Sequence, residues 1–285
     1  MSGFHRVNLA LALAVIVPFF LVPVAIMVVY SFGTQEYLTG QIHFGWSVNA
    51  WERLNDSTLI RTFLRSVELA SFATLACAVI GYPLAYFVAR HAGRFKTAAV
   101  IMIIAPFWVS FIVRAYAWLD ILGDRGPINR ALEGVGLIDS PLALVNNDIG
   151  IAIGMTYSYL PLMVFPLYVA LDRIDPAILE SARDLGASGF TAFWRVTFPQ
   201  ALPGLVGGCI LVWVPALGEY VVPTIMGGGK SLMFGNLIAL RFSQLDWPLG
   251  AAMAVAMVTF ALVIVAIGLR LVGRERLGAA DVGAT

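Results

Sequence analysis

The sequence predicts an all-α membrane protein with six transmembrane helices. Hydrophobic residues make up 60% of the 285 residues and charged residues only 12%, whereas a soluble domain has about 25% charged residues. The few charges leave six long apolar stretches, and a bilayer crossing takes about 20 apolar residues. Because backbone groups in lipid must be satisfied within the segment, we expect these stretches to be helices rather than strands.

The six spans belong to one predicted transmembrane domain of residues 1–275, followed by a loose tail of residues 276–285. The first span is longer than the apolar region of a signal peptide, about 7–15 residues. We therefore interpret it as a retained helix, with Pro18 and Pro23 as candidate bends. The expected spans cover residues of about 9–32, 66–89, 97–121, 149–171, 200–225 and 247–271.

The distribution of Lys and Arg predicts that both termini are cytoplasmic. With the amino terminus inside, ten basic residues fall on inner segments and seven on outer segments, and Arg114 lies within a span. The basic turn 90–96 and the basic end 270–276 strengthen this bias. The three long outer loops are then 35–65, 120–148 and 226–246, of which the first favours a short interfacial helix and the second a short helix over 127–134.

The stretch from Asp175 to Pro203 interrupts the apolar pattern between the fourth and fifth spans, on the predicted cytoplasmic side. Asp175 and Pro176 are typical of a helix N-cap and first helical position. Gly186 ends that helix after about ten residues, and Ser188 caps a second short helix. One face of the second helix is aromatic, with Phe190, Phe193, Trp194 and Phe198 at helical spacing. We expect this face to tie the stretch to the membrane helices.

The spacing within this stretch resembles the EAA loop of bacterial ABC importer permeases. That family pattern is E-A-A, three residues, G, nine residues, then I-x-L-P. Here Glu180-Ser181-Ala182 is followed at the same spacing by Gly186 and then by Val196-Thr197-Phe198-Pro199. Ser181, Val196 and Phe198 depart from the pattern, but each keeps the size class or apolar character of the family residue. The position between spans four and five of six also matches the family.

Further segments resemble the spermidine/putrescine permease subfamily, and most of all the first permease of its heterodimer. They are APFWVSFIVRAYAW (105–118), RGPIN (125–129), PALGEYVVPTIMGGGKSLMFGNLI (215–238) and DWPLGAA (246–252). Permeases for iron, thiamine and phosphonates share parts of this pattern. The resemblance therefore implies an importer subunit for polyamines, with another small solute as the alternative.

The resemblance also implies a mechanism, a location and partners. The loop between spans four and five, residues 172–199, would dock on a separate ATPase, since the sequence shows no nucleotide site of its own. The chain would be a non-catalytic subunit of the bacterial inner membrane, without a cofactor. It would work with a homologous second permease, two ATPase subunits and an external binding protein. The expected coupling residues are Glu180, Ser181, Ala182, Arg183, Asp184 and Gly186.

Ionisable residues inside spans are costly and are functional candidates by default. A pathway for a di- or trication needs carboxylates and aromatic faces to replace hydration. In the alternative interpretation, Arg114 pairs with Glu219 or Asp120 and only holds helices together. Glu68 is close enough to the interface to be solvated, and we expect no special role for it. The candidate pathway residues are Glu219, Tyr220, Trp118, Asp120, Tyr157 and Arg114.

Several other functions find little support in the sequence. The glycines at 227–229 before Lys230 suggest a phosphate-binding loop, but Thr224 stands where that motif needs glycine, so we expect a tight turn. A net charge of +1 gives no electrostatic case for nucleic acid. The two cysteines and three histidines have no metal-ligand spacing, so no metal is predicted. Hydrolase and protease motifs are absent from the sequence, and it shows no inverted repeats typical of ion-driven carriers.

Overall fold

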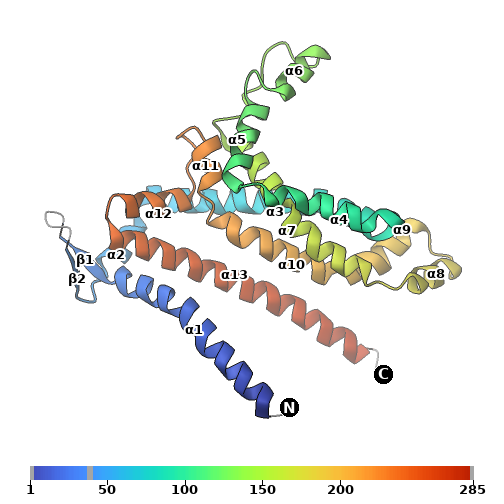
Figure 1. Ribbon diagram of the computed structural model, residues 1–285, viewed down its shortest axis with the longest axis horizontal. Helices are drawn as coiled ribbons and strands as arrows, with labels where there is room; N and C mark the ends of the chain where they lie inside the picture. Colours follow the sequence, from blue (N-terminus) through green and yellow to red (C-terminus); the bar gives the residue numbers. More distant parts are fainter. Residues whose placement is uncertain (1–2, 37–40, 283–285) are drawn as a thin grey trace. The chain divides into compact units, whose positions relative to one another are not determined.

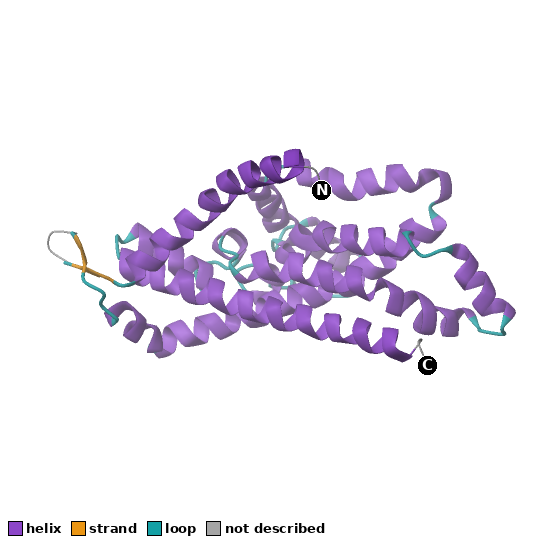
Figure 2. Cartoon of the chain, turned by 90° about the horizontal axis from the view of Figure 1, so that it is seen from below, coloured by secondary structure: helices purple, strands orange, loops and turns teal. Residues whose placement is uncertain are grey.

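The computed structural model describes residues 3–36 and 41–282, and most of this part of the chain is helical (Figures 1 and 2). The chain forms two compact units, residues 1–62 with 237–263 and residues 63–236 with 264–285. The unit boundaries fall inside three helices, α3 (Ser57–His91), α12 (Phe234–Ser243) and α13 (Trp247–Val282).

The first unit contains a two-stranded ribbon that the sequence analysis did not predict. The unit begins with α1 (Gly3–Ser31), which is followed by the two strands of the ribbon, β1 (Gly33–Gln35) and β2 (Ile42–Phe44). The helix α2 (Asn49–Glu52) and the short 3-10 helix η1 (Arg53–Asn55) come next. The strands are antiparallel, with Gly33 opposite Phe44. A Cβ on Gly33 would lie 3.1 Å from the Ile42 side chain and 3.2 Å from the Tyr30 carbonyl oxygen, so glycine permits this close approach. The short helix α2 was expected in this loop.

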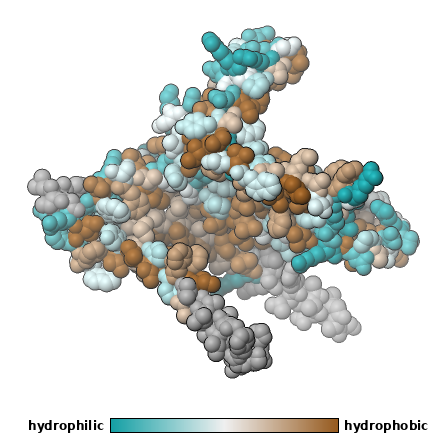
Figure 3. Space-filling model, viewed as in Figure 1, coloured by the Kyte–Doolittle hydropathy of each residue, from teal (hydrophilic) through white to brown (hydrophobic). Residues whose placement is uncertain are grey.

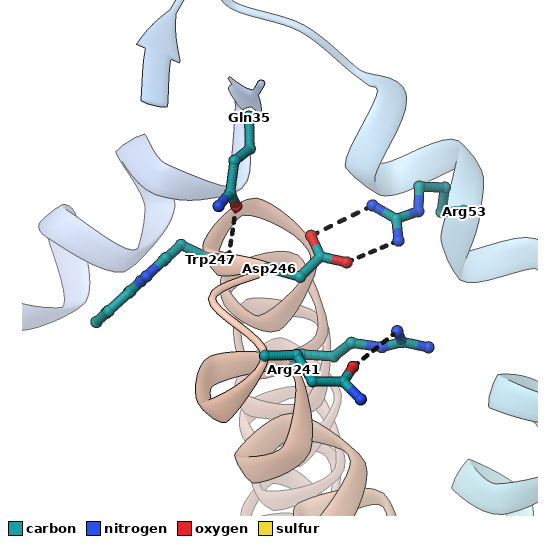
Figure 4. A network of polar contacts seen from close by, with 6 residues as sticks. Gln35, Arg53, Arg241, Asp246 and Trp247 are labelled. Carbon is teal, nitrogen blue, oxygen red and sulfur yellow. Dashed lines mark hydrogen bonds and ion pairs between the residues drawn. The ribbon is translucent and has the colours of Figure 1, made fainter. Parts of the chain in front are cut away.

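Polar contacts connect the ribbon, η1 and the start of α13 within the first unit (Figure 4). Arg53 makes a two-pronged ion pair with Asp246, with Nη2 and Nη1 at 2.7 and 3.3 Å from the two carboxylate oxygens. The Trp247 amide donates to Gln35 Oε1 at 3.2 Å. Paired fork geometry is the strong form of the arginine–carboxylate contact, so these residues fix where α13 begins.

The second unit holds the remaining helices. They are η2 (Gly93–Phe95), α4 (Lys96–Ile104), η3 (Ala105–Trp108), α5 (Phe111–Leu122), α6 (Pro127–Gly134), α7 (Asp148–Asp172), α8 (Pro176–Asp184), α9 (Gly189–Ala192), the π-helix η4 (Phe193–Thr197), α10 (Phe198–Leu217) and α11 (Val221–Met226). The bounds of α6 are those that the sequence predicts. Asn129 fixes the loop around it, because its side-chain amide bonds the backbone of Gly123 and Leu142 at 2.9–3.1 Å.

The core of the second unit is the antiparallel pair α7 and α10. Small residues bring the two backbones together, as in many membrane helix pairs. A Cβ on Gly204 would lie 2.5 Å from the Ala170 Cβ, and one on Gly208 would lie 2.7 Å from the Met163 sulfur. Polar side chains add α3 to this pair. The Trp213 indole donates to Ser71 Oγ at 3.1 Å, and the Cys77 thiol donates to the Thr156 carbonyl at 3.3 Å.

The predicted third span, 97–121, is not one continuous helix. The segments Gly93–Trp108 and Phe111–Gly134 meet at 94° (Figure 1). Pro106 lacks an amide proton and cannot continue the helical hydrogen bonds. Val109 and Ser110 then adopt extended conformations, with ψ of 139° and 136°. The apolar composition of this stretch concealed a break that the proline helps to create.

Four helices of the described residues are long and apolar enough to cross a membrane, in ranges 57–91, 148–172, 189–217 and 247–270, and the bent α4–α5 pair can add a fifth. The described part of α1 offers the shorter apolar helix Ile16–Ser31. The predicted fifth span, 200–225, is interrupted after Leu217, before α11 begins.

Helix α13 runs on to Val282, beyond the start of the predicted loose tail at residue 276. No helix was expected over residues 276–282, which were interpreted as part of a loose tail. Alanine is the residue with the highest helix propensity, and the adjacent Ala279 and Ala280 favour the continued helix. The tail prediction for residues 283–285 lies outside the described residues.

The surface of the helices is apolar over long stretches. Phe72, Leu75 and Val79 of α3 are more than half exposed, and so are Phe165 of α7 and Leu262 of α13. Exposed apolar patches of this extent mark contact with lipid or with protein partners. In Figure 3, hydrophobic residues cover much of the helical surface, whereas hydrophilic residues gather on α6 and around α8. This distribution agrees with a protein that lies in a membrane.

Candidate functional site

The loop between α7 and α10 is built around α8, and its two ends are formed as the sequence predicts. The Asp175 carboxylate accepts a hydrogen bond from the Ala177 amide at 2.9 Å, and Pro176 occupies the first turn. At the other end Gly186 has a φ of +83°. Its amide donates to the Arg183 carbonyl at 2.8 Å, and the next amide, of Ala187, donates to Ala182 at 3.0 Å. These two bonds form a Schellman motif, which satisfies the last carbonyls of the helix.

The expected coupling residues lie on an open edge of this loop. Glu180, Ser181, Arg183, Asp184 and Gly186 are exposed, and Ala182 is half-buried. Leu185, which the sequence analysis did not select, is 90% exposed. Its bare side chain directly follows the exposed Arg183 and Asp184. Its position directly before the helix-ending glycine was the only available signal.

The second half of the loop anchors it to α3. Ser188 Oγ caps α9 by accepting from the Thr191 amide at 3.2 Å. The Phe193 ring lies 5.7 Å from the Tyr82 ring and 5.9 Å from the Tyr86 ring, and Phe198 also contacts Tyr82, at 5.7 Å. The predicted aromatic face is therefore divided.

Two members of that face bind the loop to a membrane helix, while the other two, Phe190 and Trp194, are 75% and 48% exposed. The two exposed rings contact each other with centroids 6.2 Å apart. They add an aromatic surface next to the charged edge of α8. Figure 1 shows α8 and α9 at the end of the α7–α10 pair that is farthest from α11.

The other end of the α7–α10 pair carries Glu219, which is 5% exposed. Its Oε1 accepts from the amides of Tyr220, Val221 and Val222 at 2.9, 2.8 and 3.3 Å. Its Oε2 accepts from the Tyr159 hydroxyl. The carboxylate therefore caps the amino terminus of α11, where free amides and the helix dipole favour a negative charge.

Tyr159, the hydrogen-bond partner of Glu219, was not among the residues predicted from the sequence. The predicted pathway residue Tyr157 lies two positions earlier on the same helix, and two helical positions differ by about 200° around the axis. Only one of the two hydroxyls can therefore reach α11. The Tyr157 ring instead lies 5.1 Å from the Trp118 ring, so those two predicted residues do come together. Nothing in the sequence distinguishes the two tyrosines.

The ion pair expected in the alternative interpretation of Arg114 is not found among the described residues. Arg114 is 8% exposed, and its guanidinium lies 5.0 Å from the Phe107 ring and 5.4 Å from the Phe111 ring. Its Nε and Nη1 are buried without a hydrogen-bond partner. The Phe111 ring also lies 6.3 Å from the Tyr159 ring. The rings of Phe107 and Phe111 therefore lie beside the Arg114 guanidinium, where the alternative interpretation placed a carboxylate.

The two remaining candidates are exposed. Tyr220 is 53% exposed, and its carbonyl accepts from the Asn236 amide at 2.8 Å. The same Asn236 nitrogen contacts Thr224 Oγ1 at 2.7 Å, so this residue, also missed, joins α11 to the start of α12. Asp120 is exposed near the end of α5. Within residues 3–36 and 41–282, no ion pair joins it to another pathway candidate.

The glycines after α11 form the tight turn that was expected. Gly228 and Gly229 have φ angles of +59° and +74°. A Cβ on Gly228 would lie 2.6 Å from the Asn146 side chain, so this position requires glycine for space as well as for conformation. The Asn146 amide donates to the Met226 carbonyl at 2.8 Å, which joins the turn to the segment before α7.

Comparison with known proteins shows that these features lie within one protein-family domain. Residues 81–274 match the model of the family described as "Binding-protein-dependent transport system inner membrane component". The chain belongs to this family. The matched range contains the loop around α8, the Glu219 cap and the broken α4–α5 segment, so these features all lie inside the family domain.

Individual relatives agree with this assignment. The spermidine/putrescine transport system permease protein PotB of Salmonella typhimurium is 35% identical over 257 residues, covering 90% of this chain and 89% of that protein. PotB of Escherichia coli is 38% identical over 213 residues, covering 74% and 78%. A bacterial alginate ABC transporter, solved in complex with an alginate-bound periplasmic protein, has a chain of the same fold, with a TM-score of 0.73 at 16% identity and coverage of 95% and 94%.

As a member of this family, the chain is a multi-pass permease subunit of the inner membrane. It is not an enzyme, since ATP hydrolysis in ABC transporters belongs to a separate subunit. Two features of the structure are compatible with a permease subunit. A capped loop projects from one end of a helix pair, and a buried carboxylate organises the other end.

Proposed function

We propose that this permease imports polyamines such as spermidine and putrescine. The observation that carries the proposal is the 35% identity to a spermidine/putrescine permease across 90% of the chain. ATP-driven alternating access would move the substrate from an external binding protein to the cytoplasm. The alternative is the same machinery acting on iron, thiamine or a phosphonate.

Six spans with both termini in the cytoplasm are part of the proposal. The four apolar helices, the bent α4–α5 pair and α1 together give six. The excess of basic residues on one set of loops supports the orientation. This orientation puts α8 in the cytoplasm. The Lys96–Asp172 ion pair supports this orientation, because it joins the first residue of α4 to the last residue of α7, both on the proposed cytoplasmic side.

The loop around α8 is proposed to dock on the ATPase. Its caps at Asp175 and Gly186 hold α8 rigid, and Phe193 connects it to α3. A movement of the ATPase would therefore be transmitted to the membrane helices rather than absorbed in the loop. The proposed contact residues are Glu180, Ser181, Ala182, Arg183, Asp184, Leu185 and Gly186, whose exposed charges suit charge-assisted hydrogen bonds.

The proposed pathway uses aromatic and acidic groups near α5, α7 and α11. Trp118 and Tyr157 form an aromatic pair, and Tyr220 offers an exposed ring. Such rings attract ammonium groups through their faces. Asp120 adds an exposed carboxylate, and Arg114 on the same helix limits the local negative charge. Glu219 is a positioning residue in this scheme, because its oxygens are already occupied by α11 and by Tyr159.

The proposed assembly contains this permease, a homologous second permease, two ATPase subunits and an external binding protein. The periplasmic protein bound to the alginate transporter supports the kind of partner. The decisive experiment reconstitutes the complete complex in proteoliposomes and measures ATP-dependent uptake of labelled spermidine and putrescine. Iron, thiamine and phosphonate serve as competitors. Uptake blocked only by polyamines supports the proposal, and ATPase stimulation only by an anion contradicts it.

A further inference from the structure

A cavity of about 310 Å³ lies between α3 and α7 in the second unit. Its walls are mainly apolar, and three charged residues lie among its lining residues. This volume is at the lower end of the range of small-molecule sites, about 300–1,000 Å³. The cavity is separate from the pathway candidates described above. The charged members are Arg65, Glu68 and Asp148, and the apolar members include Leu69, Phe72 and Ile153.

The cavity has one more carboxylate than guanidinium groups, so one of its two carboxylates is not balanced by a positive charge within it. Arg65 forms an ion pair with Asp148 and also donates to Ser231 Oγ at 2.8 Å. Two carboxylates and one guanidinium give a net charge of one negative unit. Glu68 is exposed, and no ion pair with it occurs in the part of the chain that the structure describes. The Asp148 carboxylate is only partly buried, with 48% of the side chain exposed, so it keeps free acceptor positions.

This combination selects the chemistry of a ligand. An anion would meet two carboxylates and a guanidinium that is already engaged with Asp148 and Ser231. A primary ammonium group can instead donate hydrogen bonds to both carboxylates, while a methylene stem covers the apolar walls. The Phe72 ring, 57% exposed, adds an aromatic face for the cation.

The position of the cavity along α7 also fits entry from outside. Its α7 residues lie in the first two turns of that helix, whereas the loop around α8 follows the last turn. A helix of 25 residues spans about 37 Å at 1.5 Å per residue, which exceeds the hydrocarbon core of about 30 Å. With the loop in the cytoplasm, as proposed, the cavity opens at the outer face.

We infer that Glu68 and Asp148 form an outer binding site for a primary ammonium group on an apolar stem. The polyamine substrate is the source that follows from the proposed function, and an aminolipid headgroup such as phosphatidylethanolamine has the same chemistry. The site would hold the cation after it leaves the binding protein and before it reaches the aromatic pair of Trp118 and Tyr157.

The test measures binding of radiolabelled spermidine to the permease–ATPase complex in nanodiscs, without the binding protein. Glu68→Gln is expected to weaken binding about two- to fivefold, the range for one partly exposed ion pair. Glu68→Lys, which puts an ammonium group into the cavity, is expected to abolish it. Glu133→Gln, an exposed carboxylate on α6, is the matched control and should leave binding unchanged. Assembly of each variant is checked by co-purification of the ATPase.

The outcomes separate this site from the proposed function. Wild-type uptake of spermidine tests the function by itself. If uptake is normal and both Glu68 variants bind spermidine as the wild type does, the site is wrong while the function stands. Nanodiscs of phosphatidylcholine with and without phosphatidylethanolamine distinguish the two sources. Loss of Glu68-dependent spermidine binding only when phosphatidylethanolamine is present assigns the site to the lipid headgroup.

Discussion

The Tyr159 hydroxyl donates a hydrogen bond to Glu219, and this bond joins the middle of α7 to the start of α11. The carboxylate uses its other oxygen for three backbone amides of α11. One side chain therefore connects the end of α10, the short helix α11 and α7. A buried carboxylate is stable here because four donors, three backbone amides and the Tyr159 hydroxyl, form hydrogen bonds to it.

Replacing Tyr159 by Phe should destabilise the permease by about 1 kcal/mol, the order found for polar contacts between membrane helices. The ring would still fill its space, so only the hydrogen bond is lost. Thermal unfolding of the purified complex measures the change. Tyr157→Phe is the matched control, because that hydroxyl does not contact Glu219, and it should have little effect. A double-mutant cycle with Glu219→Gln should give a coupling energy clearly different from zero; strict additivity would refute the link.

Gly186→Ala should weaken coupling between ATP hydrolysis and transport. The φ of +83° costs a residue with a Cβ about 1–2 kcal/mol, although a Cβ there would meet nothing within 4 Å. The effect is therefore conformational rather than steric. We expect lower substrate-stimulated ATPase activity with normal assembly of the membrane helices. Gly186→Asn, which tolerates this conformation better, should retain more activity than the alanine variant. Equal activity of the two variants and the wild type would show that the Schellman end is dispensable.

Asp246→Asn should loosen the start of α13. The change removes one charge of the two-pronged pair with Arg53, whose side chain is 37% exposed. Because the arginine is partly solvated, we expect a loss of only about 1 kcal/mol, near the upper end for pairs in contact with water. Hydrogen exchange of the amides around residues 245–250 should become faster. Glu52→Gln, on the neighbouring helix α2, is the control. Unchanged exchange in the Asp246 variant would mean that the pair contributes nothing to the order of this segment.

The sequence predicted local structure well where a single residue type decides it. The caps at Asp175, Ser188 and Gly186 were all predicted and all occur, because each depends on short-range hydrogen bonds or on a conformation that glycine favours. The family also followed from the residues of the motif, their spacing and the position of the loop between the fourth and fifth spans. Composition, however, does not register a break in an apolar stretch, so the bend after Trp108 and the interruption after Leu217 were missed.

Side-chain partners were harder to predict, because they depend on which face of a helix meets which neighbour. Tyr157 was selected as a pathway residue, whereas the contact of Tyr159 with Glu219 was not foreseen. The alternative interpretation of Arg114 gave it a carboxylate partner, whereas its guanidinium meets two phenylalanine rings. Glu68 is exposed, but the sequence did not indicate that it lines a cavity with Asp148, which depends on the packing of α3 against α7. Each of these outcomes depends on tertiary packing that helical periodicity alone does not determine.

Arg114→Met should leave the stability of the isolated permease unchanged or raise it. Two guanidinium nitrogens are buried without an acceptor, and an apolar side chain of similar length removes their desolvation cost while it keeps contact with Phe107 and Phe111. Thermal unfolding of the chain in detergent measures this. Arg195→Met, at an exposed arginine outside this aromatic site, is the control for a general effect of removing a charge. If Arg114→Met instead destabilises the chain by about 3 kcal/mol or more, the size expected for breaking a buried charge pair, then the guanidinium has an acceptor in the folded permease. The aromatic rings alone would not account for its burial in that case.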